Sequence, residues 1–120
     1  KNKDIIYTGF VSDEEAVALR KAARVYVQPS FEEGFGIPLL EAFACKVPVV
    51  SSDKASLPEV GGDACLYFDP YNVEDMAEKI SEILNSNKLS KELIEKGEKR
   101  VKMFSWKKMA EETLKVYEDL

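Results

Sequence analysis

The sequence predicts an α/β fold, a Rossmann-like parallel sheet with helices on both faces. Short apolar runs alternate along the chain with longer segments of helical periodicity, which is typical of a parallel sheet with right-handed crossovers. One run, Val47–Val50, is apolar throughout, as parallel strands covered on both faces tend to be. With 120 residues, 45% of them hydrophobic, the chain fits one domain with a real core.

Four short strands are expected. They cover Ile5–Tyr7, Val25–Val27, Val47–Val50 and Cys65–Phe68. Turn residues follow them, such as Thr8 and Gly9 after the first strand and Asp69 and Pro70 after the fourth.

The first helix is marked by Ser12 and Glu15, whose spacing is the capping-box pattern. This helix is expected to run to about Ala23 and to bury Ala16, Leu19 and Ala23.

Further helices follow the later strands. Pro38 suits the first turn of the second helix, where its missing N–H costs nothing. Asn72 caps an amphipathic helix that reaches Leu84. A more polar helix is expected over about Ser90 to Met103, and a separate last helix is expected to begin at Ser105.

Composition excludes several classes of function. The net charge of −5 argues against a nucleic-acid binder, and the absence of histidine removes Ser-His-Asp and Cys-His catalysis. Cys45 and Cys65 lie in apolar runs and are expected to be buried free thiols, although a disulfide between them stays open. No apolar run is long enough to span a membrane and the first residues do not look like a signal peptide, so a cytoplasmic protein is expected.

The loop from Pro29 to Gly36 is the first place to look for a site. Ligands of open α/β sheets bind outside the carboxyl ends of the strands, where loops lead into helix N-termini. Gly34 and Gly36 bracket Phe35 directly before the second helix. Glycines let the backbone approach a ligand, and the helix N-terminus favours an anion such as a diphosphate.

Two carboxylates flank this helix start. Glu33 lies on the loop and Glu41 one turn inside the helix, so both can reach a ligand that lies across the helix start. A carboxylate accepts two hydroxyl hydrogen bonds, which suits sugar and ribose diols. Spacing alone is equally compatible with Glu33 as a first-turn carboxylate that stabilises the helix dipole and with Glu41 as a solvated residue. Glu32 is the alternative to Glu33.

The segment from Pro29 to Ala42 reads Pro-Ser-Phe-Glu-Glu-Gly-Phe-Gly-Ile-Pro-Leu-Leu-Glu-Ala. It resembles the Glu-x7-Glu segment of glycosyltransferase family 4, the glycosyl transferases group 1, which are retaining enzymes of the GT-B fold. The similarity continues through Leu57–Val60 and Phe68–Pro70 and covers nearly the whole chain. It implies the C-terminal nucleotide-sugar-binding domain, truncated at its N-terminal side.

The resemblance also implies roles for the residues of this segment. Glu33, in the catalytic position, would hold hydroxyls of the transferred sugar, and Glu41 would hold the ribose. The other donor-binding residues would be Gly34, Phe35, Gly36, Ile37 and Leu40. Backbone N–H groups of the middle three would face the sugar and the diphosphate, and the leucine would pack on the ribose or base side.

The implied substrate is a UDP- or GDP-linked hexose, with mannose or glucose as the sugar, and no metal or cofactor is expected. In the family, transfer retains the anomeric configuration without an agreed enzymic nucleophile, and the leaving diphosphate is stabilised electrostatically.

The resemblance places further parts of the enzyme outside this chain. The Arg and Lys that grip the diphosphate, two strands of the sheet and the acceptor-binding domain would lie upstream, so the fragment is expected to be inactive alone. Residues 1–104 would form the partial Rossmann-like domain, and residues 105–120 the helix that crosses to the N-terminal domain. Open sheet edges predict a homo-oligomer or a rearranged sheet. Lys46 stands where many relatives have glycine.

Two other classes of function need motifs that this sequence lacks. A non-catalytic α/β regulatory module, such as a receiver domain, needs an acidic cluster after its first strand, where this chain has Thr8 and Gly9. A dinucleotide-binding dehydrogenase needs Gly-x-Gly-x-x-Gly at that position, which is also missing.

Overall fold

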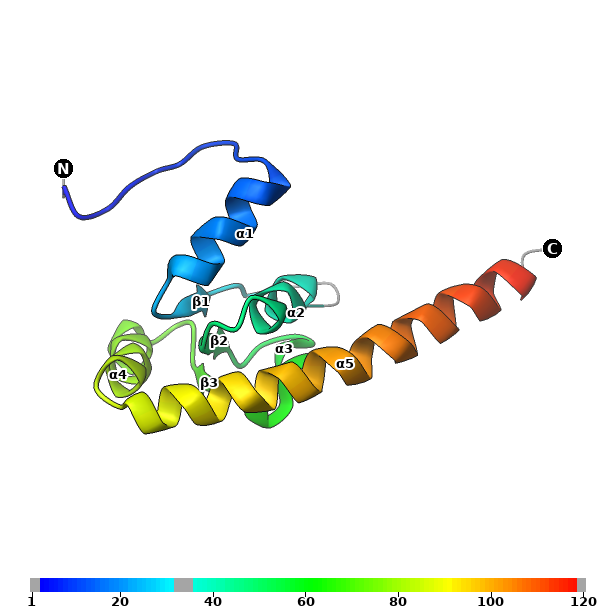
Figure 1. Ribbon diagram of the computed structural model, residues 1–120. Helices are drawn as coiled ribbons and strands as arrows, with labels where there is room; N and C mark the ends of the chain where they lie inside the picture. The colour runs from blue at the N-terminus through cyan, green and yellow to red at the C-terminus, as the bar shows by residue number, and fades with distance from the viewer. Residues whose placement is uncertain (1–2, 32–35, 119–120) are drawn as a thin grey trace.

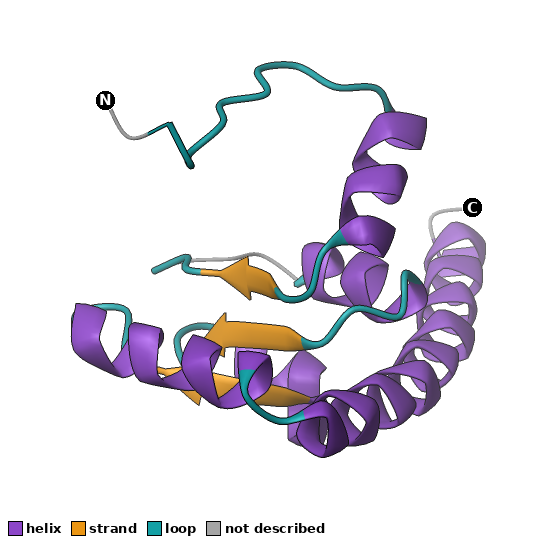
Figure 2. Cartoon of the chain, turned by 60° about the vertical axis from the view of Figure 1, so that its left-hand side comes forward, coloured by secondary structure: helices purple, strands orange, loops and turns teal. Residues whose placement is uncertain are grey.

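The computed structural model of the chain describes residues 3–31 and 36–118, with side chains as far as residue 104. Three parallel strands form its sheet in the order β1-β2-β3. They are β1 (Tyr26–Gln28), β2 (Val49–Ser52) and β3 (Cys65–Phe68). Figure 2 shows the three arrows pointing the same way, with helices on both sides of them. The predicted α/β class with a parallel sheet is therefore confirmed.

The two faces of the sheet are covered by different helices. One face carries α2 (Ile37–Ala44), α3 (Leu57–Gly61) and the middle of α5 (Asn87–Glu118), and its core holds Leu39, Phe43, Val49, Leu57, Val60, Cys65 and Phe104. The other face carries α4 (Val73–Leu84) and the first turns of α5, around Val50, Phe68, Ile83 and Leu93. Cys45 and Cys65 are free and buried, as expected.

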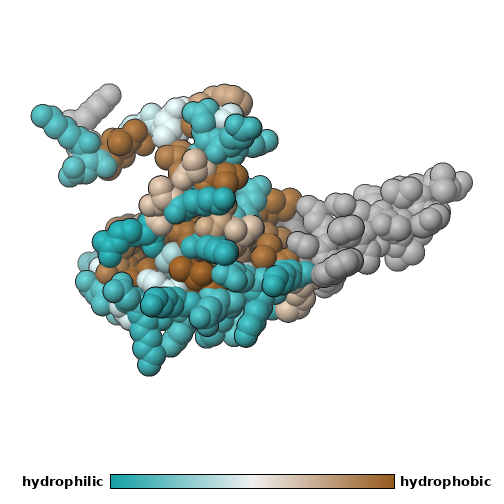
Figure 3. Space-filling model, viewed as in Figure 1, coloured by the Kyte–Doolittle hydropathy of each residue, from teal (hydrophilic) through white to brown (hydrophobic). Residues whose placement is uncertain are grey.

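Residues Ile5–Tyr7 do not form the predicted first strand. They belong to an extended arm that lies beyond α1, away from the sheet (Figure 1), and the Ile6 side chain is 81% exposed. A strand needs a hydrogen-bonded neighbour, and among the described residues β1 pairs only with β2. The other edge of β1 is free, but the arm does not lie along it (Figure 1), so the apolar run forms no strand. Figure 3 shows hydrophobic surface on this arm and again beside α1.

Helix α1 (Asp13–Ala22) confirms the predicted capping box, but its predicted burial is wrong. The Ser12 N–H donates to Glu15 Oε1 and the Glu15 N–H donates to Ser12 Oγ, both at 3.1 Å. No residue of α1 is buried, and the Leu19 side chain is 52% exposed. The apolar side of this helix stays open because the described sheet ends at β1 and places no strand beneath it.

The end of the chain differs from the prediction of two helices. Helix α5 is continuous from Asn87 to Glu118, so the expected start at Ser105 is wrong. No proline or glycine follows Gly97 in the sequence, and a serine inside a helix is tolerated. The real start is marked by Ser86, whose Oγ accepts a hydrogen bond from the Leu89 N–H at 3.1 Å. The predicted cap of α4 is confirmed, since Asn72 Oδ1 accepts from the Asp75 N–H at 3.1 Å.

The helices described are either too short or too polar to cross a membrane.

Candidate functional site

The carboxyl end of the sheet holds buried polar side chains that sequence reasoning did not single out. Gln28 ends β1, and Ser51 and Ser52 end β2 with no exposed surface on either serine. Ser51 Oγ donates to the Ser52 carbonyl at 2.9 Å, and Ser52 Oγ accepts from the Lys54 N–H at 3.1 Å. These bonds fix the turn that follows β2 at the edge where ligands of such sheets bind.

A second polar chain leads out of β1 toward the glycine loop. Tyr26 Oη donates to Gln28 Oε1, and Gln28 Nε2 donates to Ser30 Oγ, both at 2.6 Å. Ser30 precedes Phe31, whose ring lies 4.7 Å from that of Tyr71. The strand end is therefore held in place up to the point where the loop begins.

The far end of this loop is set by Gly36. Its φ of 80° and ψ of 28° lie in the left-handed region, and a Cβ there would meet Val60 at 3.3 Å. Glycine satisfies both constraints, because it tolerates positive φ and brings no side chain against Val60.

Helix α2 begins directly after Gly36. Pro38 lies in its first turn, as predicted, and has no N–H. The Leu39 N–H donates to the Gly36 carbonyl at 3.0 Å. Ile37 is the first residue of α2, and the N–H groups of a first helical turn have no partner within their helix. An N–H there, with the positive end of the helix dipole, can receive an oxyanion.

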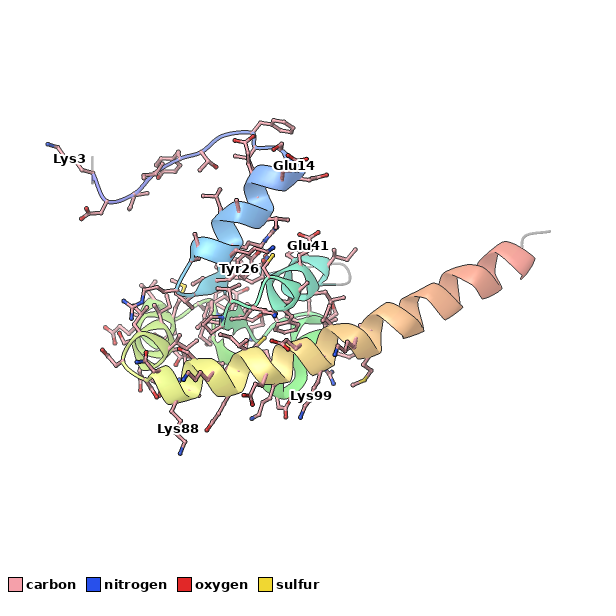
Figure 4. All side chains as sticks on the ribbon, in the orientation of Figure 1. Lys3, Glu14, Tyr26, Glu41, Lys88 and Lys99 are labelled. Atoms are coloured by element: carbon pink, nitrogen blue, oxygen red, sulfur yellow. The ribbon has the colours of Figure 1, made fainter. Side chains whose placement is uncertain are left out.

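Glu41 lies on the same helix, and its partner is a residue that sequence reasoning missed. Glu41 Oε2 lies 3.0 Å from Arg20 Nη2 of α1; the Glu41 side chain is 50% exposed, that of Arg20 21%. Figure 4 labels Glu41 on the side of α2 that faces α1. No local pattern could have revealed this pair, since it joins two helices separated by β1.

A pocket of about 420 Å³ lies between α1 and α2, and both members of the ion pair line it. The rest of its wall consists of two charged and four apolar residues: Asp13 and Lys21, and Ala16, Val17, Ala44 and Cys45. Its volume is within the range of about 300–1,000 Å³ that is usual for small-molecule sites.

The other predicted site residues divide into two groups. Gly36 caps the N-terminus of α2 and Ile37 and Glu41 lie within this helix, while Leu40 is half-buried and packs against the core beneath α2. Glu33, Gly34 and Phe35 lie outside the described residues, as does the alternative Glu32. The convergence of Glu33 with Glu41 therefore stays a prediction.

The family model described as "Glycosyl transferases group 1" matches residues 1–100. O-antigen chain mannosyltransferase B of Escherichia coli is 43% identical over 113 residues, which are 94% of this chain and 30% of that protein. MMP alpha-(1->4)-mannosyltransferase of Mycolicibacterium hassiacum is 37% identical, with 96% of this chain and 29% of the relative covered.

Among solved structures, sucrose-phosphate synthase from Thermosynechococcus elongatus matches with a TM-score of 0.83 and 28% identity, over 95% of this chain and 29% of that one. The chain spans less than a third of each of these three proteins. Sequence, family model and fold agree: this chain belongs to the glycosyl transferases group 1 family and has the architecture of part of a GT-B glycosyltransferase.

Proposed function

We propose that this chain is the donor-binding part of a retaining glycosyltransferase that transfers a hexose from a nucleoside-diphosphate sugar. The observation that carries the proposal is the placement of Gly36, Ile37 and Glu41 on one helix start at the carboxyl side of a parallel sheet. One short helix thus carries an N-terminus that can bind an anion and a carboxylate that can accept hydrogen bonds from a diol, as a nucleotide sugar requires.

In this proposal the diphosphate lies at the N-terminus of α2, and Glu41 accepts hydrogen bonds from the ribose hydroxyls. Glu33 holds hydroxyls of the transferred sugar. The bond between the anomeric carbon and the diphosphate oxygen breaks as an acceptor oxygen bonds to the same face of that carbon, and the proton of the acceptor hydroxyl passes to the leaving diphosphate. The helix N-terminus stabilises the charge that develops on the leaving diphosphate. No metal ion or further cofactor takes part.

Mannose is the favoured sugar because two relatives, at 43% and 37% identity, are named as mannosyltransferases. UDP and GDP both remain candidate nucleotides. The acceptor site and the basic pair for the diphosphate would be supplied by other parts of the enzyme, so we expect donor binding without transfer. Association of copies through the free edge of β1 and a cytoplasmic location remain predictions.

The proposal is tested by calorimetric titration of the chain with UDP, GDP, GDP-mannose, UDP-glucose and NADH. We expect a uridine or guanosine diphosphate compound to bind and NADH to fail. Glu41→Gln should weaken binding by about 1–3 kcal/mol, since an acceptor for ribose hydroxyls loses its charge. Glu14→Gln, which neutralises an exposed carboxylate on α1 (Figure 4), should change affinity little. Binding of NADH alone would favour a dinucleotide-binding module, and binding of none of the five compounds a regulatory one.

A further inference from the structure

We propose that Arg20 is a positioning residue for the donor site: it holds the Glu41 carboxylate so that one oxygen faces the ribose. This inference rests on the proposed function. It adds to the Glu-x7-Glu segment a residue from a different helix, 21 positions before Glu41 in the sequence.

The contact with Arg20 gives the two oxygens of the Glu41 carboxylate different roles. Arg20 Nη2 binds Oε2 of Glu41 at 3.0 Å, and both residues line the pocket between α1 and α2. A carboxylate has two oxygens with about four acceptor positions. With Oε2 held by the guanidinium, Oε1 is the oxygen presented to a diol. The Glu41 side chain is half-exposed, so a ligand can reach it.

Arg20 is less exposed than Glu41 and makes a second contact. Its guanidinium carbon lies 5.8 Å from the centre of the Tyr26 ring, a cation–π contact. Tyr26 in turn donates to Gln28, and Gln28 donates to Ser30 at the start of the loop. One array of contacts therefore joins Glu41 to the strand end that leads into the glycine loop.

The position of Arg20 is not the best one for its own hydrogen bonds. Its Nε is buried and has no hydrogen-bond partner among the described residues. A buried unsatisfied N–H is costly and uncommon, so the geometry that produces it calls for an explanation. Orientation of Glu41 supplies one. The opposite possibility, that Arg20 masks Glu41 from a ligand, predicts the opposite sign in the same experiment.

The test compares UDP and GDP with their 2′-deoxy forms on four variants of the chain. Arg20→Met removes the charge and keeps an apolar side chain of similar length over Tyr26. Arg20→Lys keeps the charge. Lys88→Met removes a positive charge from an exposed position on α5 that does not line this pocket (Figure 4). The fourth variant combines Arg20→Met with Glu41→Gln.

We expect Arg20→Met to weaken binding of the ribonucleotide roughly 3- to 10-fold, as for the loss of one modest hydrogen bond, and to reduce the preference over the 2′-deoxy form. Arg20→Lys should recover most of both effects, and Lys88→Met should change affinity less than about twofold. In the Glu41→Gln background, Arg20→Met should have no further effect.

Three results would overturn the inference alone: tighter binding by Arg20→Met, unchanged binding, or an equal loss when Glu41 is already Gln. If the unmodified chain binds neither nucleotide, the proposed function fails and this inference fails with it. Unfolding does not confound the comparison, because α1 buries no residue in the core, and circular dichroism checks that each variant keeps the helical content of the parent.

Discussion

Gly36→Ala tests whether the backbone before α2 depends on glycine. At a φ of 80° an L-residue costs about 1–2 kcal/mol relative to glycine. The new Cβ would also lie 3.3 Å from Val60, tighter than most real contacts, which adds up to about 1 kcal/mol where the neighbour cannot move. Val60 is buried, so it has little room. We expect a total loss of about 1–3 kcal/mol.

Urea and thermal denaturation followed by circular dichroism measure this loss. For a chain of this length, each kcal/mol corresponds to roughly 4 °C in Tm. Gly9→Ala is the matched control. Gly9 also has a positive φ, 64°, but a Cβ added there would meet nothing within 4 Å, and the residue belongs to the exposed arm. Alanine at residue 9 should therefore lose at most the backbone contribution of about 1–2 kcal/mol, with no contribution from a close contact.

The contribution of the Val60 contact is separated by a double-mutant cycle with Val60→Ala. Shortening Val60 removes the atoms that the new methyl group would meet, so Gly36→Ala should be less costly in that background. Stability of Gly36→Ala equal to that of the parent chain would refute the reasoning, because it would mean that the left-handed backbone and the close approach are not required.

Three further predictions concern stability. Lys46 adopts a φ of 58°, a left-handed backbone that glycine tolerates better than lysine, so Lys46→Gly should stabilise the chain by about 0.5–1 kcal/mol in urea denaturation. Gly97→Ala, which normally favours a helix, should instead destabilise by about 1–3 kcal/mol because its Cβ would meet the Phe43 ring at 2.9 Å; unchanged or higher Tm would contradict this contact. Burial raises the pKa of the Cys65 thiol from 9.0 to about 12. The unfolded chain then loses this proton first, so stability should fall as pH rises from 9 to 12, and less so in Cys65→Ala.

The strands show how far sequence pattern predicts this fold. Cys65–Phe68 matches the predicted range, and β1 is shifted by one residue. The shift of β2 from Val47–Val50 to Val49–Ser52 has two causes. Pro48 has no N–H for the ladder and contributes only its carbonyl, which accepts from Tyr26 at 2.9 Å. Ser51 and Ser52 are polar, yet they pair with Tyr67 and Phe68, and hydrophobicity alone could not include them.

Ile5–Tyr7 and α1 show what local pattern cannot supply. Ile5–Tyr7 has the composition of a buried strand and α1 that of an amphipathic helix, and the capping box of α1 forms as predicted. Their burial, however, depends on strands beside β1 that the described sheet does not contain. The candidate site divides in the same way. Gly36, Pro38 and Glu41 were found from local chemistry, whereas Arg20 reaches Glu41 only through the packing of two helices.

The conformation of the loop before α2 depends on distant parts of the chain as well as on its own glycines. Gly36 can approach Val60 only because α3 holds Val60 beneath it. Helix α3 is in turn fixed from α5, since Arg100 Nε donates to the Val60 carbonyl at 2.9 Å and Arg100 Nη2 to the Glu59 carbonyl at 2.6 Å. These bonds satisfy carbonyls at the end of a short helix that has few of its own. The helix start offered to a diphosphate is thus supported by a side chain 64 residues further along the sequence, which is why the motif alone does not define the site.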